Sequence, residues 1–418
     1  MPSNSPVKIS GSTLRALLLF ANFLLIILGY YQIKPASRSL FVEYWGADNL
    51  PYVWIGTAVC LGVIIGGYHR IVERHSRLRV VLGSLVVFTA ALVVFRALFG
   101  VGGATVAVAF YIFVDIFSVV LVEQFWSLAN TIYTTDAGKR WYGFVATGGL
   151  VGGVAGGALA NAMLKRVGLT TEDLLLVAAG FLVALFFLNL AMALAGVYAE
   201  ARQAGSEPGV DAGDWRALFA DRYLLLVAAI VLLSQLVEPL VEFQFIKSVE
   251  SEYPDKDPRT AYISTFFSVM GIVSIAVNLV VTPLVHRFLG VMAGLMAQPL
   301  LVSLMSIGFM AQPTLFVASL LKIADRGLSY SINRASKEIL YIPIPPLLTY
   351  QAKAWIDMFG YRLFKVIGSV LILALTQWLP LGVTLAQLAV LTLGVCAAWF
   401  LAIALLAPVY RSVLARAP

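Results

Sequence analysis

The sequence contains few charged residues. Only 12% of its 418 residues are Asp, Glu, Lys or Arg, whereas 60% are hydrophobic. An average soluble domain has about 25% charged and about 45–50% apolar residues. A water-soluble fold of this length would have to expose much of its apolar surface, so we expect the chain to lie in a lipid bilayer.

Cysteine and histidine are also scarce. Cys60 and Cys396 both lie within apolar runs, and none of the three histidines is spaced as a metal ligand with another, so neither a disulfide nor a metal site is indicated. The sequence has no Walker-type G-x-x-x-x-G-K-[ST] loop, which argues against pumping driven by ATP hydrolysis. We therefore expect no metal and no cofactor. The first apolar run is too long for the core of a cleavable signal peptide.

Several apolar runs reach the length of about 20 residues that a helix needs to cross a bilayer. A membrane barrel would instead show alternating segments of about ten residues, and the sequence lacks that pattern. We predict an all-α membrane protein with about 12 transmembrane helices, arranged as two six-helix bundles of the major facilitator type. The predicted spans are 13–33, 50–71, 78–100, 104–133, 141–164, 171–198, 222–247, 260–286, 288–310, 313–340, 351–379 and 383–410.

A polar stretch divides these spans into two sets. It predicts an N-terminal bundle at 1–198, a cytoplasmic linker at 199–221 and a C-terminal bundle at 222–418. With the N-terminus inside, about seventeen Lys and Arg residues lie on the cytoplasmic side and about seven on the other, as the positive-inside rule requires. We expect a multi-pass monomer of the cell inner (plasma) membrane with both termini in the cytoplasm. The net charge of +7 follows from this bias and does not indicate nucleic-acid binding.

Charged side chains inside the spans are costly and usually face a bundle interior or a water-filled cavity. Glu238 and Glu242 are four residues apart and share one helical face, and Arg362 and Lys365 share another. One or two ion pairs would suffice to fix packing, so the larger number favours a substrate cavity over purely structural pairs. The candidate substrate-binding residues are Lys34, Arg38, Glu123, Trp126, Asn130, Glu238, Glu242, Lys322, Arg326, Arg362 and Lys365.

The types of charge suggest the substrate. Arg offers a planar fork to phosphate or carboxylate, and Lys offers a compact point charge. A surplus of both predicts a small anionic substrate, such as an organic phosphate. The nearby carboxylates would either hold the cations when substrate is absent or take up protons as the coupling ion. In addition, the glycines at 148–157 predict close approach of another helix, and Pro239 predicts a kink.

Several segments resemble a known family. They are RASKEILYIPIP at 334–345, KAWID at 353–357 and YRLFK at 361–365, with EQFWSLAN at 123–130 and AGKR at 137–140 in the first half. These segments are similar to the nucleotide transporter (ATP/ADP translocase) family of plastids and intracellular bacteria. The resemblance implies a major-facilitator-like fold and either nucleotide exchange or proton-coupled nucleotide uptake.

The same resemblance implies roles for particular residues. The family has essential lysines in its first and eleventh spans and essential glutamates in its fourth and seventh. These correspond here to Lys34 and Lys365, to Glu123, and to Glu238 or Glu242. Residues 345–350 lack the charges expected of the family at that point, and distant bacterial members need not carry ATP or ADP, so the resemblance leaves the substrate open.

Other functions remain open from the residues themselves. A transporter or flippase could carry a different anion, such as a lipid-linked phosphate. A membrane-embedded enzyme would need a nucleophile or a metal cluster at the membrane surface, and the acidic residues show no such motif. A receptor or scaffold would need more exposed surface than the short loops provide. We predict a secondary active transporter that works by alternating access, and not an enzyme.

Overall fold

A computed structural model describes residues 11–132, 135–200, 221–344, 348, 352–353, 356 and 360–415, and all secondary structure within them is helical. Ten helical segments in these ranges are long and apolar enough to cross a membrane. The predicted all-α membrane fold is therefore confirmed. Ten of the twelve predicted spans meet this criterion. Within the described residues the tenth and eleventh, at 313–340 and 351–379, do not, and part of 351–379 lies outside those residues.

The first half of the chain contains seven α-helices and two short η segments within the described residues. Their bounds are α1 (Gly11–Trp45), η1 (Ala47–Asn49), α2 (Leu50–Arg74), α3 (Arg77–Leu98), α4 (Gly103–Ile132), α5 (Thr135–Ala162), η2 (Met163–Val167), α6 (Leu174–Leu194) and α7 (Val197–Glu200).

The second half is interrupted more often by π-helical segments, which here are η3, η4, η5 and η7. Its bounds are α9 (Arg222–Glu252), α10 (Lys256–Ala276), η3 (Val277–Val281), α11 (Thr282–Phe288), α12 (Gly290–Ala311), α13 (Leu315–Lys322), η4 (Ile323–Gly327), η5 (Ser329–Asn333), α14 (Arg334–Leu340), α16 (Tyr361–Leu373), η7 (Ala374–Trp378) and α17 (Leu385–Leu414).

Contacts between residues divide the chain into two units. Unit 1 comprises residues 1–44, 61–207 and 256–268, and unit 2 comprises residues 45–60, 208–255 and 269–418. The start of α2 thus belongs to unit 2, and the start of α10 belongs to unit 1. The predicted bundle boundaries at 198 and 222 stay predictions, because residues 201–220 of the predicted linker lie outside the described residues.

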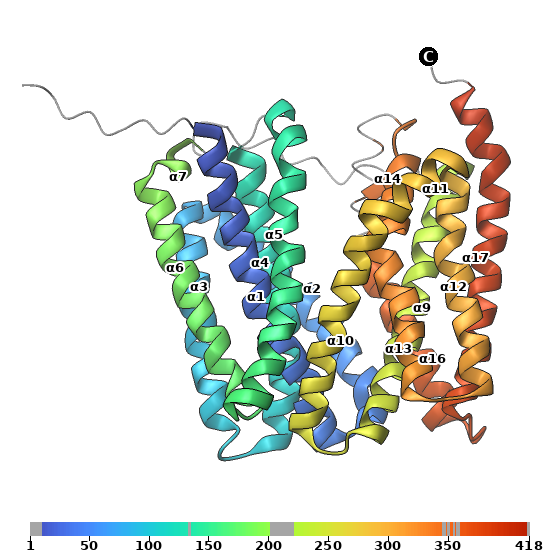
Figure 1. The fold of residues 1–418 in the computed structure, drawn as a ribbon, viewed down its shortest axis with the longest axis horizontal. Coiled ribbons are helices and arrows are strands. Elements are labelled where there is room, and N and C mark those ends of the chain that lie inside the picture. Colours follow the sequence, from blue (N-terminus) through green and yellow to red (C-terminus); the bar gives the residue numbers. More distant parts are fainter. Residues whose placement is uncertain are drawn as a thin grey trace, which may run out of the picture. The chain divides into compact units, whose positions relative to one another are not determined.

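Unit 1 is built around α1, α3, α4 and α6, whose apolar side chains form its core. Phe88 of α3 packs against Phe113 and Phe117 of α4 with ring centroids 5.7 and 5.3 Å apart. Figure 1 shows α5 running alongside α1. A Cβ added at Gly152 of α5 would lie 2.7 Å from the Leu24 carbonyl oxygen of α1. The predicted close helix approach at the glycine run is therefore confirmed.

The first span is longer than predicted. It was expected to end at residue 33, but α1 continues through Pro35 to Trp45 and has 35 residues. The polar side chains after residue 31 explain the error. Gln32, Ser37 and Ser39 are fully buried inside unit 1 and Arg38 is 6% exposed, so the segment packs against protein although its hydropathy is low.

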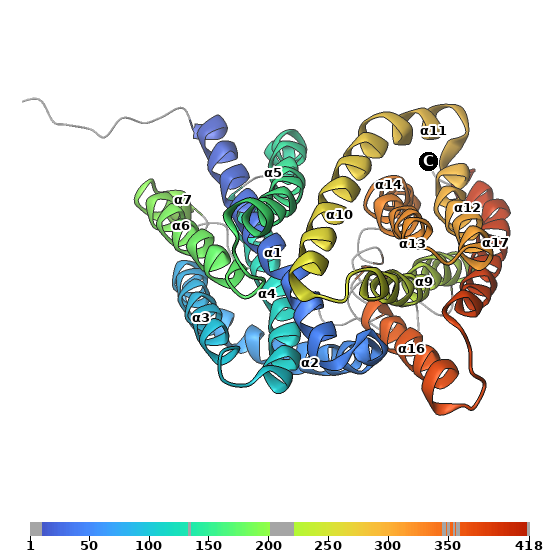
Figure 2. The same ribbon diagram turned by 60° about the horizontal axis from the view of Figure 1, so that its bottom comes forward.

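Unit 2 is built around α9. Figure 2 shows α9 surrounded by α13, α16 and α17, and these are the helices it packs against most extensively. Pro239 lies inside α9 without ending it. On α16, Gly368 sits directly against the Pro239 ring, where a Cβ would collide with it. This close approach brings α16 alongside the carboxylates of α9.

Candidate functional site

Glu238 of α9 lies at the centre of a charged cluster in unit 2. Its Oε1 forms an ion pair with Arg326 Nη2 and lies 3.9 Å from Lys365 Nζ. Its Oε2 accepts a hydrogen bond of 3.2 Å from the Tyr361 hydroxyl. Glu238 is only 6% exposed. One buried carboxylate therefore faces two cationic groups, contributed by η4 and α16.

Glu242, one turn further along α9, contacts a different cation. Its Oε2 lies 2.7 Å from Lys322 Nζ, at the end of α13. The same Nζ lies 3.6 Å from Asp325 Oδ2. Lys322 and Asp325 are each 1% exposed. Gln298 of α12 donates to the Asp325 backbone oxygen at 2.9 Å and to its Oδ1 at 3.2 Å.

The local backbone explains how so many polar groups meet here. Asp325 and Arg326 lie in the π-helical segment η4, and Asn333 ends the next one, η5. Turns of π-helix are rare and occur frequently at functional sites. They widen the helix locally, so side chains near them do not follow the regular α-helical spacing. The span predicted at 313–340 is helical without a break from Leu315 to Leu340. It consists of α13, η4, η5 and α14, and the single residue between η4 and η5, Leu328, is α-helical.

Aromatic rings also contact the cations of unit 2. Lys365 Nζ lies 5.8 Å from the centroid of the Trp54 ring, and the guanidinium of Arg326 lies 5.6 Å from that of Tyr330. Both distances are within the range of a cation–π attraction. Arg362, three residues before Lys365 on α16, is partly buried. The structure thus brings Glu238, Arg326 and Lys365 into one cluster, with Arg362 on the adjoining turn.

In unit 1, Lys34 lies among three aromatic rings. Its Nζ is 5.4 Å from the centroid of Tyr30, 5.3 Å from that of Tyr31 and 4.4 Å from that of Phe267. Tyr30 and Tyr31 belong to α1, and Phe267 belongs to the part of α10 that is grouped with unit 1. The rings leave Lys34 partly exposed while lowering the cost of burying its charge.

Arg38, one turn beyond Lys34, has an acidic partner. Its Nη2 lies 3.4 Å from Asp115 Oδ1 of α4, and its guanidinium lies 4.8 Å from the centroid of Tyr111. Arg38 is 6% exposed. This geometry gives Arg38 a structural partner in addition to the role predicted for it.

The predicted polar stripe on α4 has two different environments. Glu123 and Asn130 are exposed, and Asn130 Oδ1 accepts a hydrogen bond of 2.8 Å from the Tyr142 hydroxyl of α5. Trp126 is partly buried and packs edge-on against Phe23 and Tyr142. Trp126 is thus a packing residue of unit 1, whereas Glu123 remains accessible.

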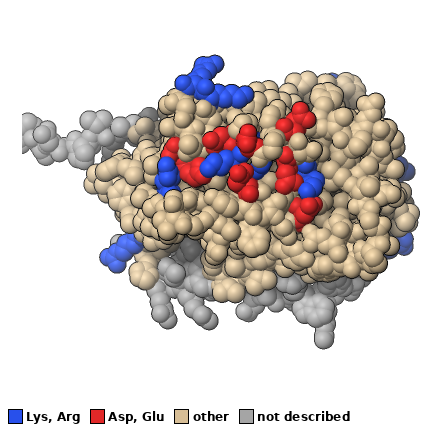
Figure 3. Space-filling model, turned by 90° about the horizontal axis from the view of Figure 1, so that it is seen from below, with Lys and Arg blue, Asp and Glu red and all other residues tan. Residues whose placement is uncertain are grey.

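Ion pairs also occur near helix ends within each unit. Figure 3 shows acidic and basic side chains side by side on the molecular surface. In unit 1, Arg96 contacts Asp173 at 2.7 Å, Arg259 contacts Glu43 at 3.4 Å, and Lys256 contacts Glu172. In unit 2, Lys247 contacts Asp48 at 2.7 Å and Glu250 at 2.9 Å.

The pKa of Asp173 is set by these neighbours. Its partial burial acts to raise the pKa, but hydrogen bonds from the Thr170 backbone N–H and hydroxyl and from Arg96 outweigh it, and the pKa lies below its ordinary value of 3.8. The carboxylate of Asp173 is therefore ionised at neutral pH and ties the start of α6 to α3.

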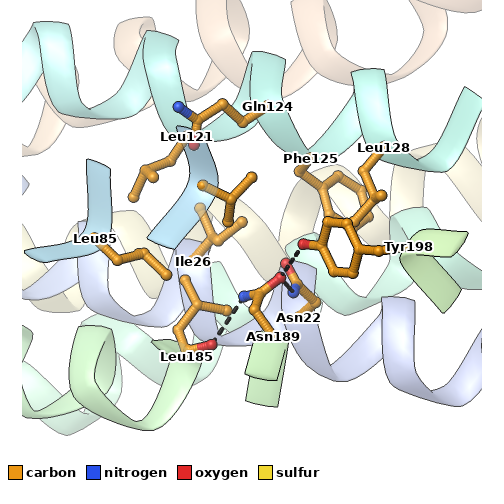
Figure 4. Close-up of a pocket in the computed structure, with 11 residues that line it drawn as sticks. Asn22, Ile26, Leu85, Leu121, Gln124, Phe125, Leu128, Leu185, Asn189 and Tyr198 are labelled. Atoms are coloured by element: carbon orange, nitrogen blue, oxygen red, sulfur yellow. Dashed lines mark hydrogen bonds between the residues drawn. The ribbon is translucent and has the colours of Figure 1, made fainter. Parts of the chain in front are cut away.

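The described residues of each unit line a cavity. In unit 2, a cavity of about 510 Å³ is lined by Phe243, Lys247 and Gln377 among others, but two carboxylates already contact Lys247. In unit 1, a cavity of about 10 Å³ lies beside Asn22, Asn189 and Tyr198. Figure 4 shows Tyr198 and Asn22 both directed at the Asn189 side chain. This space is only large enough for about one water molecule.

Sequence reasoning missed several residues of these clusters. Trp54, Tyr361 and Phe267 contact the candidate side chains, but aromatic residues are common in membrane spans and carry no distinguishing pattern. Asp325 could be found from its spacing of three residues from Lys322. Gln298 lies in another helix, and its contact with Asp325 depends on the tertiary fold.

Comparison with known proteins gives consistent matches. The chain is 25% identical over 302 residues to ADP,ATP carrier protein 1 of Chlamydia muridarum (strain MoPn / Nigg), and this match covers 63% of the chain and 57% of the carrier. The chain thus spans little more than half of that relative's length.

Solved structures share the fold at low identity. A nucleoside transporter, NupG, superposes with a TM-score of 0.68 at 13% identity, covering 94% of this chain and 99% of its own. A bacterial homologue of the iron transporter ferroportin, in an inward-facing state, gives 0.64 at 14% identity, with the same coverages. A family model described as TLC ATP/ADP transporter matches residues 105–323 and 313–410. The chain is therefore a member of the TLC ATP/ADP transporter family.

Proposed function

We propose that this protein is a secondary active transporter that carries an organic phosphate anion by alternating access, with nucleotides as the first candidates. The family supports transport, and the relatives it matches are named ADP,ATP carriers. The coupling is either exchange of one nucleotide for another or uptake together with protons.

One observation carries this proposal. In unit 2, the Glu238 carboxylate contacts Arg326 and also lies 3.9 Å from Lys365. A buried carboxylate between two cations occupies the position that a phosphate group would take. Arg can bind phosphate through two parallel hydrogen bonds, whereas Lys contributes a point charge. An incoming phosphate would therefore displace Glu238 from these cations, and Glu238 would return when the phosphate leaves.

Within unit 1, Lys34 is a separate candidate anion-binding group. The rings of Tyr30, Tyr31 and Phe267 hold its ammonium by weak cation–π attraction, which is easier to give up than a buried ion pair.

The experiment is uptake into liposomes. The purified protein is reconstituted into vesicles preloaded with unlabelled nucleotide, and entry of labelled ATP, ADP and other organic phosphates is measured. Lys365→Ala is expected to abolish uptake, because it removes a cation of the cluster. Arg411→Ala is the matched control, since Arg411 lies exposed near the end of α17, and it is expected to leave uptake nearly unchanged.

Each result decides something definite. Absence of uptake of every nucleotide, with and without a proton gradient, would overturn the nucleotide proposal. Uptake of a different organic anion, such as a lipid-linked phosphate, would retain transport and replace the cargo. Equal effects of the Lys365 and Arg411 substitutions would show that the cluster does not bind substrate.

The proposed location is the inner membrane, with both termini in the cytoplasm. The excess of Lys and Arg on the side of the termini supports this orientation. Single cysteines introduced near the N-terminus and in the connections between helices, labelled with a membrane-impermeant reagent in intact cells, test it. Labelling of Ser5→Cys in intact cells would contradict the orientation.

A further inference from the structure

Asp325 is a deeply buried carboxylate that lacks a full set of partners. It is 1% exposed, and its Oδ1 accepts a hydrogen bond from Gln298. Its Oδ2 is buried and accepts no hydrogen bond from any described residue. The cation in contact with it is Lys322, 3.6 Å from Oδ2, and the same Nζ lies closer, at 2.7 Å, to Glu242. Asp325 therefore shares its counter-ion with a nearer carboxylate.

The other charged groups around Asp325 do not compensate for this deficit. Arg326 points to Glu238 on α9, and Lys365 of α16 lies near the same carboxylate. The α12 helix contributes the neutral Gln298, η5 contributes Tyr330, and α17 contributes Cys396. Among the described residues, the titratable groups in contact with Asp325 or on the elements around it are Glu238, Glu242, Lys322, Arg326, Tyr330, Lys365 and Cys396.

An ionised carboxylate in this position raises the free energy of the folded protein. Removing a charge from water costs several kcal/mol unless a close partner and hydrogen bonds replace the lost hydration. A proton on Asp325 removes the charge and turns Oδ2 from an acceptor without a donor into a donor. A second buried oxygen in the same network, Oδ1 of Asn333, also accepts no hydrogen bond from the described residues. Asn333 is joined to Asp325 through Gln298.

We propose that Asp325 is a proton-binding site, and that its protonation is the step that couples transport to a proton gradient. The proton is taken from water on one side of the membrane and released on the other. When Asp325 is protonated, Lys322 pairs with Glu242 alone. When it is ionised, the two carboxylates compete for Lys322, which disturbs the face of α9 that also carries Glu238. The coupling step rests on the proposed transport function, whereas proton binding does not.

A sodium ion is the competing ligand for buried oxygens. The ammonium of Lys322 lies 3.6 Å from Asp325 Oδ2 and would repel a second cation, whereas a proton neutralises the carboxylate itself. The site is therefore assigned to a proton.

The test is an infrared difference spectrum of the purified full chain during a pH titration, which detects the carbonyl stretch of a protonated carboxyl group. Wild type is expected to gain this band as the pH is lowered. Asp325→Asn should lose one such component, whereas the control Asp255→Asn should keep it, because Asp255 is exposed. An unchanged band in Asp325→Asn would overturn the proposal. Sodium-dependent thermal stabilisation at fixed pH that disappears in Asp325→Asn would also overturn it, in favour of a sodium site.

Two further measurements keep the result decisive. Where Asp325→Asn does not fold, Glu242→Gln is used, because it removes the carboxylate that competes with Asp325 for Lys322. In this variant the protonation of Asp325 should shift to lower pH. In liposomes, an inward proton gradient should raise wild-type uptake several-fold, and this ratio should fall to about one in Asp325→Asn. Wild-type vesicles that take up no nucleotide would refute the proposed function, while the infrared titration would still decide whether Asp325 binds a proton.

Discussion

Glu238 of α9 and Arg326 of η4 form a buried ion pair in unit 2, and Lys365 of α16 lies 3.9 Å from the same carboxylate oxygen. Two cations therefore compete for one carboxylate. The arrangement resembles a binding site already filled by an internal anion. The strength of the contacts between Glu238 and these two cations should therefore set both the affinity and the rate with which an external anion binds.

Replacing Glu238 by Gln tests this competition. Glu238→Gln removes the internal anion, so a phosphate-bearing ligand should bind about tenfold more tightly, as expected for loss of a charge-assisted contact worth about 1.5 kcal/mol. Turnover should fall, because no carboxylate remains to displace the ligand. Kd from ligand-induced thermal shifts and exchange rates in liposomes measure the two effects. Glu338→Gln, an exposed carboxylate paired with Lys353, is the control. Weaker binding in Glu238→Gln would mean that Glu238 positions the cations instead.

The aromatic surroundings of Lys34 give a second prediction. Phe267→Leu removes the ring closest to its ammonium, which lies 4.4 Å from the centroid. Loss of about 0.5–2 kcal/mol of cation–π attraction should change anion affinity several-fold. Phe113→Leu is the comparison, since Phe113 packs against other Phe side chains in the core of unit 1. The same change in both variants would mean that the ring contributes only packing.

The glycine face of α5 gives a third prediction, about stability. Gly152→Ala would place a Cβ 2.7 Å from the Leu24 carbonyl oxygen, so α1 and α5 must separate, at a cost of about 1–3 kcal/mol. Gly143→Ala introduces the same methyl group on the same helix with no atom within 4 Å. It should leave the melting temperature unchanged or raise it slightly through helix propensity. Thermal unfolding in detergent compares the two, and equal melting temperatures would contradict the close packing.

The fourth prediction concerns acid. The folded-state pKa of Asp173 is lowered, so the carboxylate stabilises the protein above its unfolded pKa, and this contribution is lost as the pH falls through the folded pKa. Asp173→Asn should therefore melt at a lower temperature than wild type at about pH 7, and the difference should shrink below about pH 4. The pair is partly exposed, so an effect of about 1 kcal/mol or less is expected. A difference that persists unchanged at low pH would argue against the ionised carboxylate as its cause.

Much of the fold could be predicted from the sequence, because crossing a bilayer requires long apolar helices. The match of the family model to residues 313–410 confirms the resemblance seen in the segments at 334–345, 353–357 and 361–365. Apolar runs did not predict the end of a helix whose last turns are polar but buried in protein. This is why α1 extends to Trp45, well beyond the predicted end at residue 33.

The candidate site was only partly predictable. The i, i+4 spacing of Glu238 and Glu242 correctly placed both on one face of α9, and the structure places cations opposite them. Spacing within one helix cannot show which cation each of these carboxylates pairs with. Arg38 meets Asp115, and Lys34 meets aromatic rings, through contacts between different helices. The roles predicted for all eleven candidate residues stay predictions.

The wide turns at η4 and η5 have a consequence for comparing this chain with its relatives. A helix that loses one residue within Ile323–Gly327 can tighten that turn into ordinary α-helix and leave its flanking turns intact. Because a π turn holds about one residue more than an α turn, the side chains on the two sides of the deletion would keep nearly the same relative orientation. A relative that is one residue shorter here would therefore keep the flanking charged side chains in register, and the change in length would move only the side chains within the turn, including Asp325 and Arg326.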